Sequence, residues 1–217
     1  MGFSKEWERL YKNGQQMSLW PWSSLVSLAS RYGNLREGMK VLELGCGAGA
    51  NIPFFIARNV DYYAIEGSDT MVKVLKEKFP QKNVHISQGD FTRSLPQGEY
   101  QLIVDRSALT HNQTMSIKST IELIKNVLAD DGRFIGIDWF STKSSEYERV
   151  GAQDVDENTK LFTEGYFAGL GHVHFSDEQR IRDLFREFSF IYMAENVKRI
   201  MIPSQQVEAV WDFVVCR

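Results

Sequence analysis

The sequence contains few residues that could bind a metal ion through sulfur. Its 217 residues include only two cysteines, Cys46 and Cys216, and neither lies at zinc-ligand spacing from another cysteine or a histidine. His172 and His174 would share one face of a strand, but a third ligand is missing around them, so we expect packing or substrate contact there and no metal. Such low cysteine use suits the reduced cytosol, and a cytoplasmic protein is expected.

Long hydrophobic runs and clusters of positive charge are also missing. No apolar run approaches the ~20 residues of a membrane span, and residues 1–7 lack the hydrophobic core of a secretory signal. The formal net charge is −3 and the lysines and arginines are dispersed, so we expect no binding to nucleic acid or to a membrane. A small molecule is the expected partner of a monomer or homodimer.

A glycine-rich turn follows the first apolar strand. The strand over residues 41–44 leads directly into Gly45-x-Gly47-x-Gly49, and a helix is expected from Asn51. Glycine suits a turn whose backbone angles are closed to other residues, and it lets a ligand approach the main chain. The pattern therefore predicts a ligand site at this turn.

The acid before this turn indicates which ligand is bound. A carboxylate beside a pyrophosphate is unfavourable, whereas Glu43 would stabilise the ammonium of an amino-acid ligand. The run Glu43-Leu-Gly-Cys-Gly-Ala-Gly49 resembles the first motif, Asp/Glu-x-Gly-x-Gly-x-Gly, of class I S-adenosylmethionine-dependent methyltransferases. A glycine-rich turn without a ligand is the alternative.

The resemblance implies the fold, the cofactor and several contacts. It implies an α/β protein with a Rossmann-like, seven-stranded, mostly parallel sheet with one antiparallel strand, helices on both faces and a single domain. S-adenosylmethionine would be the cofactor and S-adenosylhomocysteine the product. The implied cofactor contacts at the turn are Glu43, Gly45, Cys46, Gly47, Gly49 and Asn51.

Acids at the ends of the next strands extend the expected cofactor site. Glu66 lies 17 residues after Gly49, at the end of a strand over residues 61–65, where it suits the ribose hydroxyls; a solvated cap is the alternative. Met71, in the following helix, is expected to touch the ligand. By the family resemblance, Asp90 and Phe91 would form the adenine pocket, although Gly-Asp pairs are also common in Asx turns.

The fourth strand, over residues 101–104, leads into the expected reaction site. The run Asp105-Arg-Ser-Ala-Leu109 resembles the Asp-Arg-Gly-Ala-Leu segment of thiopurine-methyltransferase-like enzymes, with Ser107 in place of glycine. Asp105 would face the cofactor. The Asp/Asn-Pro-Pro-aromatic signature of nucleic-acid amino-methyltransferases is absent, which argues against a base-flipping enzyme.

Three residues are candidates for the chemistry. Arg106 would bind an acidic acceptor or form a salt bridge, and His111 would act as a general base or cap a helix. Asp138 ends the fifth strand, over residues 134–137, and would reach the same space. Methylation of an O, N or S atom of a small, polar, anionic metabolite is therefore expected.

Several aromatic residues precede the first strand. Trp7 and Tyr11 would share one face of a short helix, and Trp20 and Trp22 flank a proline. They would either dock this segment on the domain or form a lid over the cofactor, because a sulfonium cation attracts aromatic faces. In the lid, Tyr11 and Trp20 would contact the cofactor.

The expected organisation is one domain with four segments. They are an N-terminal helical lid (1–35), a cofactor-binding core (36–140), a substrate-cap insertion (141–175) and a C-terminal helix with two strands (176–217). The insertion is expected to be a long polar loop. A helix over residues 117–128 should close at Gly132, and Ser176 should open the last helix with a capping box.

Two other functions are compatible with the sequence. A nicotinamide-dependent oxidoreductase is allowed by Gly45-x-Gly47-x-x-Ala50 and Glu66, but no Tyr-x-x-x-Lys pair occurs to donate a proton. A module that binds S-adenosylmethionine without turnover is the second alternative.

Overall fold

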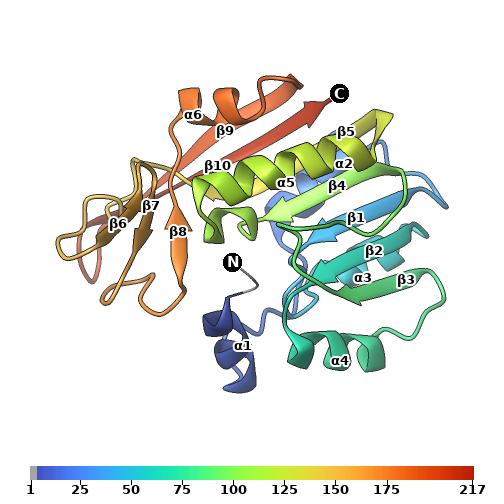
Figure 1. Cartoon of the computed structure of the whole chain (residues 1–217), viewed down its shortest axis with the longest axis horizontal. Helices are drawn as coiled ribbons and strands as arrows, with labels where there is room; N and C mark the ends of the chain where they lie inside the picture. Colours follow the sequence, from blue (N-terminus) through green and yellow to red (C-terminus); the bar gives the residue numbers. More distant parts are fainter. Residues whose placement is uncertain (1–3) are drawn as a thin grey trace.

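A seven-stranded sheet forms the centre of the molecule (Figure 1). The computed structural model describes residues 4–217. The strand order is β3-β2-β1-β4-β5-β10-β9, and β10 is antiparallel to both of its neighbours while the other six strands share one direction. This arrangement confirms the expected fold. The strands are β1 (Lys40–Leu44), β2 (Asp61–Glu66), β3 (Val84–Gln88), β4 (Tyr100–Arg106), β5 (Leu128–Phe140), β9 (Ser189–Ile200) and β10 (Gln206–Cys216).

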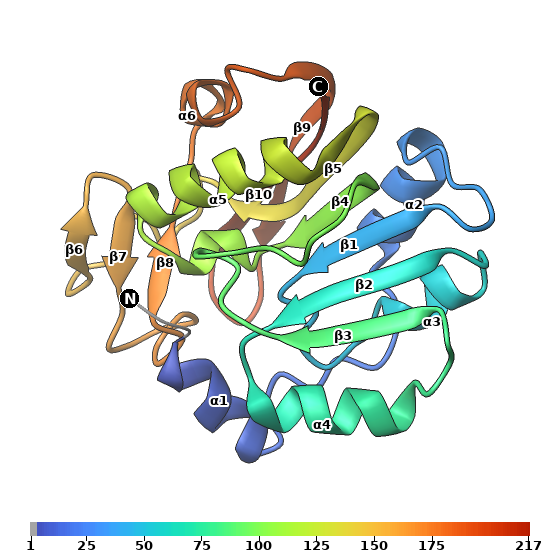
Figure 2. The same cartoon turned by 45° about the vertical axis from the view of Figure 1, so that its right-hand side comes forward.

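Helices cover both faces of this sheet because its strands are apolar on both sides. In β1, Val41 packs into the core beneath α2, α3 and α4, whereas Leu42 and Leu44 pack into the core beneath α5 and α6. Figure 2 shows α5 lying along the sheet. The helices of these layers are α2 (Ser23–Tyr32), α3 (Ile52–Ile56), α4 (Asp69–Lys78), α5 (Thr114–Val127) and α6 (Glu178–Leu184).

Residues 141–175 contain a small sheet, which the sequence did not predict. The strands β6 (Gln153–Asp156), β7 (Thr159–Leu161) and β8 (His172–His174) pair in the order β6-β7-β8, all antiparallel. The prediction of a polar loop is wrong, because this segment folds around an apolar cluster of its own. Its buried members are Phe162, Phe167, Leu170, Val173 and Phe175. The sheet lies beyond the carboxyl ends of β4 and β5, and α1 (Lys5–Lys12) lies between it and α4 (Figures 1 and 2).

Two helix boundaries differ from expectation. The helix that was expected to close at Gly132 ends at Val127, and strand β5 begins at the next residue. Leu128 and Ala129 are buried in β5, which pairs with β4, so they extend the strand and not the helix. The cap of α6 is Asp177, whose side chain accepts a hydrogen bond from the Arg180 N–H at 2.8 Å. Ser176 is buried instead, one position before the cap.

A carboxylate of the small sheet caps helix α5. Gln113, at the N-cap position of that helix, makes no side-chain cap. Instead Asp156 accepts hydrogen bonds from the Thr114 N–H at 2.9 Å and from its hydroxyl at 3.0 Å. Burial opposes ionisation, but backbone hydrogen bonds from Asn158 and Thr114 hold the pKa of Asp156 at about 2. The small sheet is thereby tied to the helix that follows the fourth strand.

Replacing Asp156 by alanine should destabilise the fold by about 0.5–2 kcal/mol, the usual loss for a helix cap. Urea unfolding at neutral pH would measure it. The folded pKa of about 2 lies below the unfolded value of about 3.9, so the stabilisation is complete above that unfolded value and disappears as the pH falls towards 2. In the same strand, the exposed Asp154 is paired only with Lys160, and Asp154→Ala should change stability by less than about 0.5 kcal/mol. Equal losses in the two variants would contradict the capping role.

Candidate active site

A cavity of about 560 Å³ opens at the carboxyl ends of the parallel strands. The glycine-rich turn forms one end of it, and the segment that carries the small sheet forms the other. Ligands of open α/β sheets bind at this edge, where the strand order reverses on either side of β1. The volume is typical of sites for small molecules and cofactors.

The three glycines of the turn have left-handed backbone angles, but they have different neighbours. A Cβ on Gly45 would lie 2.5 Å from the Ala108 side chain, and one on Gly47 would lie 2.8 Å from the Tyr11 hydroxyl. Both glycines line the cavity. Gly49 does not; a Cβ there would lie 2.5 Å from Leu75 of α4. Gly49 was expected to contact the cofactor, and the structure places it in helix packing instead.

Glu43 stabilises the glycine turn through buried hydrogen bonds. Its carboxylate accepts hydrogen bonds from the Asn51 amide at 2.8 Å and from the Tyr62 hydroxyl at 2.6 Å. Burial raises the pKa of Glu43 to about 7, against the effect of these two bonds. Asn51 also accepts a hydrogen bond from the Trp22 N–H at 3.2 Å, so the N-terminal segment joins the same network. Glu43 and Asn51 both line the cavity.

Glu66 joins the end of β2 to the glycine turn. Its two oxygens accept hydrogen bonds from the backbone N–H groups of Gly47 and Ser68, each at 2.8 Å. Burial raises the pKa of Glu66 in spite of these bonds. The side chain lines the cavity, as does Cys46, and its contact with a ligand stays a prediction.

Asp90 lines the cavity, and one of its carboxylate oxygens lacks a hydrogen-bond partner in the described part of the chain. Its Oδ1 accepts hydrogen bonds from the N–H and the hydroxyl of Thr92, at 3.0 and 2.6 Å. Its Oδ2 is shielded from solvent and has no hydrogen-bond partner among residues 4–217, although the Arg93 guanidinium lies 3.3 Å away. Buried acceptors are normally satisfied, so this oxygen fits a ligand that donates a hydrogen bond. Phe91 lines the cavity next to it.

Three residues expected at the cofactor lie elsewhere. Asp105 is fully buried, accepting hydrogen bonds from the Leu109 N–H and from the Trp139 indole, and it does not line the cavity. Met71 is buried in the core. Trp20 is 82% exposed and does not line the cavity, whereas Trp22 does. Asp105 is buried in strand β4 and Met71 on the buried side of helix α4, so neither side chain reaches the cavity.

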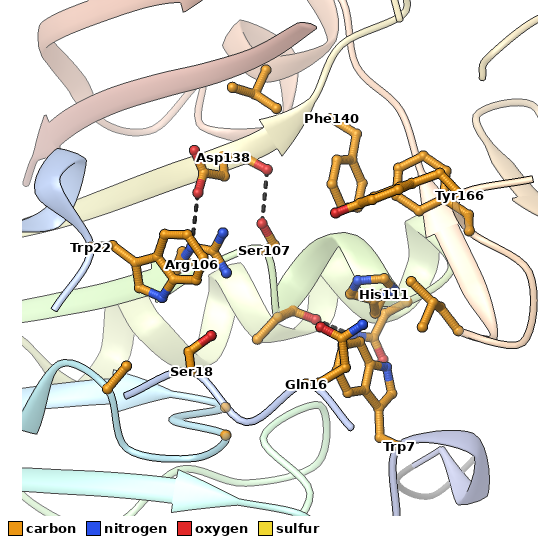
Figure 3. A pocket seen from close by; sticks show the side chains of 18 of the residues that line it. Trp7, Gln16, Ser18, Trp22, Arg106, Ser107, His111, Asp138, Phe140 and Tyr166 are labelled. Carbon is orange, nitrogen blue, oxygen red and sulfur yellow. Dashed lines mark hydrogen bonds and ion pairs between the residues drawn. The ribbon is translucent and has the colours of Figure 1, made fainter. Parts of the chain in front are cut away.

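Arg106 and Asp138 meet at the ends of β4 and β5. The Arg106 Nε donates to the Asp138 carboxylate at 2.8 Å, and the guanidinium carbon lies 3.4 Å from the centre of the Trp22 ring (Figure 3). Ser107 has a φ of +56° and donates its hydroxyl to the Asp138 carbonyl at 2.9 Å. That angle explains why glycine suits this position in the similar motif, and the extra hydrogen bond helps serine to adopt it.

His111 is oriented by the small sheet. Its Nδ1 lies 2.9 Å from the carbonyl oxygen of His172 in β8. A carbonyl only accepts hydrogen bonds, so Nδ1 carries the hydrogen and the Nε2 of the neutral ring keeps its lone pair. Burial lowers the pKa of His111 to about 4, which keeps the ring neutral at physiological pH. The ring lies edge-on between Trp7 and Phe140 (Figure 3).

The two histidines of β8, His172 and His174, are not arranged as metal ligands. The Nδ1 of His174 lies 3.0 Å from the Thr159 hydroxyl, inside the small sheet. Within the described part of the chain, no group of three His, Cys, Asp or Glu side chains is placed to hold a metal ion. In the same residues, no helix is both long and apolar enough to cross a membrane.

Several lining residues were not identified as site residues from the sequence. They come from the N-terminal segment and from the region of the small sheet, and they include Gln16, Ser18, Phe140, Tyr166 and Phe167. The aromatic content of the first 22 residues was a signal for the first group. The length of the insertion, which was expected to be a substrate cap, was a signal for the second group, but it did not single out the aromatic residues that line the cavity.

Comparison with known proteins identifies the family. A family model described as a methyltransferase domain matches residues 17–194. The chain belongs to this methyltransferase family. An uncharacterised methyltransferase of Bacillus pumilus is 25% identical over 171 residues, which cover 76% of this chain and 79% of the relative.

Solved methyltransferase structures share the fold. TehB of Haemophilus influenzae superposes with a TM-score of 0.65 at 14% identity, covering 97% of this chain and 67% of that protein. The 1,6-didemethyltoxoflavin-N1-methyltransferase of Burkholderia thailandensis, solved with 1,6-didemethyltoxoflavin and S-adenosylhomocysteine, gives 0.58 at 15% identity, over 88% of this chain and 76% of that protein. Membership of a methyltransferase family sets aside the nicotinamide-dependent oxidoreductase that the sequence also allowed.

Replacing Glu66 by alanine should weaken binding of S-adenosylhomocysteine by about 1–3 kcal/mol, because a charged acceptor is lost from the cavity. Calorimetry on the wild-type methyltransferase and the variant would measure the change, and NAD should bind poorly to both. Asp69→Ala is the matched control, since this acid lies just beyond the cavity and pairs with Lys73. An unchanged affinity for S-adenosylhomocysteine in the Glu66 variant would contradict a role for Glu66 in binding the ligand.

Proposed function

We propose that this methyltransferase transfers the methyl group of S-adenosylmethionine to an O, N or S atom of a small molecule. The observation that carries the proposal is a single cavity, lined both by the glycine turn and by the aromatic residues near the small sheet. Its volume of about 560 Å³ has room for a cofactor and a small acceptor in contact. A macromolecular acceptor would have to enter this space with an extended segment.

The residues of the turn half of the cavity fit the cofactor. Gly45 and Gly47 line this half, and the Oδ2 of Asp90, which has no hydrogen-bond partner among residues 4–217, would accept a hydrogen bond from the adenine amine. Phe91 would pack on the adenine ring, and Glu66 would accept the ribose hydroxyls. When bound, S-adenosylmethionine supplies a methyl group on a positively charged sulfur.

The opposite half of the cavity would hold the acceptor. His111 would remove a proton from the acceptor through Nε2, and Arg106 with Asp138 would orient the acceptor at the ends of β4 and β5. The segment 141–175 would serve as the substrate cap, since Phe140 and Tyr166 line the cavity beside His111 (Figure 3). Alignment of the reacting atoms supplies most of the rate in a direct displacement.

Helix α1 would act as a lid that keeps water out of the cavity. Its Glu8 carboxylate accepts hydrogen bonds from the hydroxyls of Ser68 and Thr70 at the start of α4. Its Tyr11 hydroxyl lies next to Gly47, and its Trp7 ring lies 4.9 Å from the His111 ring. The helix therefore touches both halves of the cavity.

If α1 is a lid, bound S-adenosylhomocysteine should slow tryptic cleavage at Lys5, Arg9 and Lys12, because the ligand stabilises the docked helix. Mass spectrometry of timed digests would measure the rates. Glu8→Gln should speed cleavage by weakening the contacts to α4. Glu6→Gln is the control on the same helix, because Glu6 accepts a hydrogen bond from the nearby Ser4 hydroxyl and makes no contact with α4 among the hydrogen bonds and ion pairs of residues 4–217. Cleavage rates that do not respond to ligand would leave α1 as simple packing.

His111→Gln should reduce turnover by about 10²-fold while S-adenosylhomocysteine affinity is unchanged. The expected loss is at the low end for a general base because the pKa of His111 is lowered to about 4. The base must be unprotonated, so kcat/KM should fall only as the pH drops towards 4, and the variant should lack this fall. His85→Gln, on β3 away from the cavity, is the control. An acid limb that survives in the His111 variant would exclude this role.

A further inference from the structure

The charged residues around the acceptor half of the cavity are paired. We define the acceptor compartment as the cavity wall formed by residues within 106–111, 138–146, 166–170 and 196–210. The charged side chains in this wall are Arg106, Asp138, Glu146, Lys198 and Glu208. Arg106 pairs with Asp138 at 2.8 Å and Lys198 with Glu208 at 3.1 Å, while Arg149, behind the wall, holds both oxygens of Glu146.

Asp138 and Trp22 limit the access of an anion to Arg106. Its Nε is engaged by Asp138, and one face of the guanidinium is covered by the Trp22 ring at 3.4 Å. A second carboxylate, Asp212, lies behind this pair and accepts a hydrogen bond from the Asp138 N–H at 2.9 Å. An acidic acceptor would therefore approach two carboxylates together with the single guanidinium, and the anionic acceptor expected from the sequence is disfavoured.

The resident cations likewise limit the access of another cation to the carboxylates. Glu146 is buried, and Arg149 contacts both of its oxygens. Glu208 is paired with Lys198 in adjacent strands of the β9–β10 hairpin. An ammonium group entering the compartment would have to displace a resident cation. An ion that loses its water without gaining a partner is strongly disfavoured.

Part of the remaining wall is aromatic, and the rest is neutral, with serine, amide and aliphatic side chains. Ring centres are 4.9 Å apart for Trp7 and His111, 5.5 Å for His111 and Phe140, 4.7 Å for Phe140 and Phe167, and 5.0 Å for Phe167 and Tyr166, all edge to face. Tyr166 is 75% exposed, which is unusual for an aromatic ring that lines a cavity. Aromatic faces of this kind pack on flat apolar rings.

Resting on the function proposed above, we infer that the acceptor is a neutral molecule with a flat ring, which packs against Phe140 and Tyr166 and directs a hydroxyl or amine towards His111. The compartment selects against ions because its own charges are already paired. The acceptor class is thus defined by charge and shape.

Three phenols that share a ring and differ in charge test this inference. The probes are 4-ethylphenol (neutral), 4-hydroxyphenylacetate (anionic) and tyramine (cationic), titrated by calorimetry at neutral pH into the full chain saturated with S-adenosylhomocysteine. The neutral phenol should bind at least about tenfold more tightly than either ion. Tyr166→Ala should weaken its binding.

Two variants that break one ion pair test the cause of the selectivity. Asp138→Asn leaves Arg106 unpaired and should shift the preference towards the anion, whereas Arg106→Gln leaves Asp138 unpaired and should shift it towards the cation. Lys73→Gln is the matched control, because its exposed ion pair with Asp69 lies on α4 outside the compartment. Melting curves would show that each variant is folded.

Each outcome decides between the two proposals. Tighter binding of either ion, equal binding of all three probes, or no binding at millimolar concentration would overturn the inference about the acceptor, and methyl transfer to a different small molecule would still support the proposed function. If S-adenosylhomocysteine binds but no small molecule of any charge is methylated, the proposed function fails instead. Opposite shifts in the two variants would support charge pairing as the basis of selection.

Discussion

The hydrogen bond between the Gly47 N–H and the Glu66 carboxylate joins the turn after β1 to the end of β2, and the cavity depends on it. A buried carboxylate is normally unfavourable, but this one is satisfied by two backbone N–H groups. Glu43 supports the same turn from the other side through Asn51 and Tyr62. The two acids therefore fix a backbone conformation that only glycine adopts easily, and a ligand site opens above it.

The second end of the cavity is fixed by contacts across long stretches of sequence. Asp156 of the small sheet caps α5, and the His172 carbonyl accepts a hydrogen bond from the His111 ring. These two bonds join the small sheet to the segment after β4, which carries His111. The tautomer of His111 and the position of the aromatic residues in the cavity wall therefore both depend on the position of the small sheet. A change in the small sheet would therefore alter both the acceptor site and the proposed general base, His111.

Ion pairing also shapes what the site can recognise. From the sequence, Arg106 had two interpretations, an anion site or a salt bridge, and the structure shows the salt bridge with Asp138. The same ion pair joins two of the three residues that the sequence indicated as candidates for the chemistry. Since both are partly buried at the wall of a cavity, their mutual attraction is stronger than that of a surface pair, and they act as one neutral unit towards a ligand.

The sequence by itself determined the sheet, the glycine turn and the positions of Glu66, Asp90 and His111 at its edge, because strand ends and turns depend on local patterns of apolar residues and glycine. Tertiary structure decided which of two tryptophans faces the cavity, and it placed Asp105 and Met71 in the core. It also folded an apparently polar insertion into a small sheet, and the segment between β7 and β8 brings Tyr166 and Phe167 to the cavity wall. These features depend on contacts between residues far apart in the chain, where burial and hydrogen-bond satisfaction override any local preference.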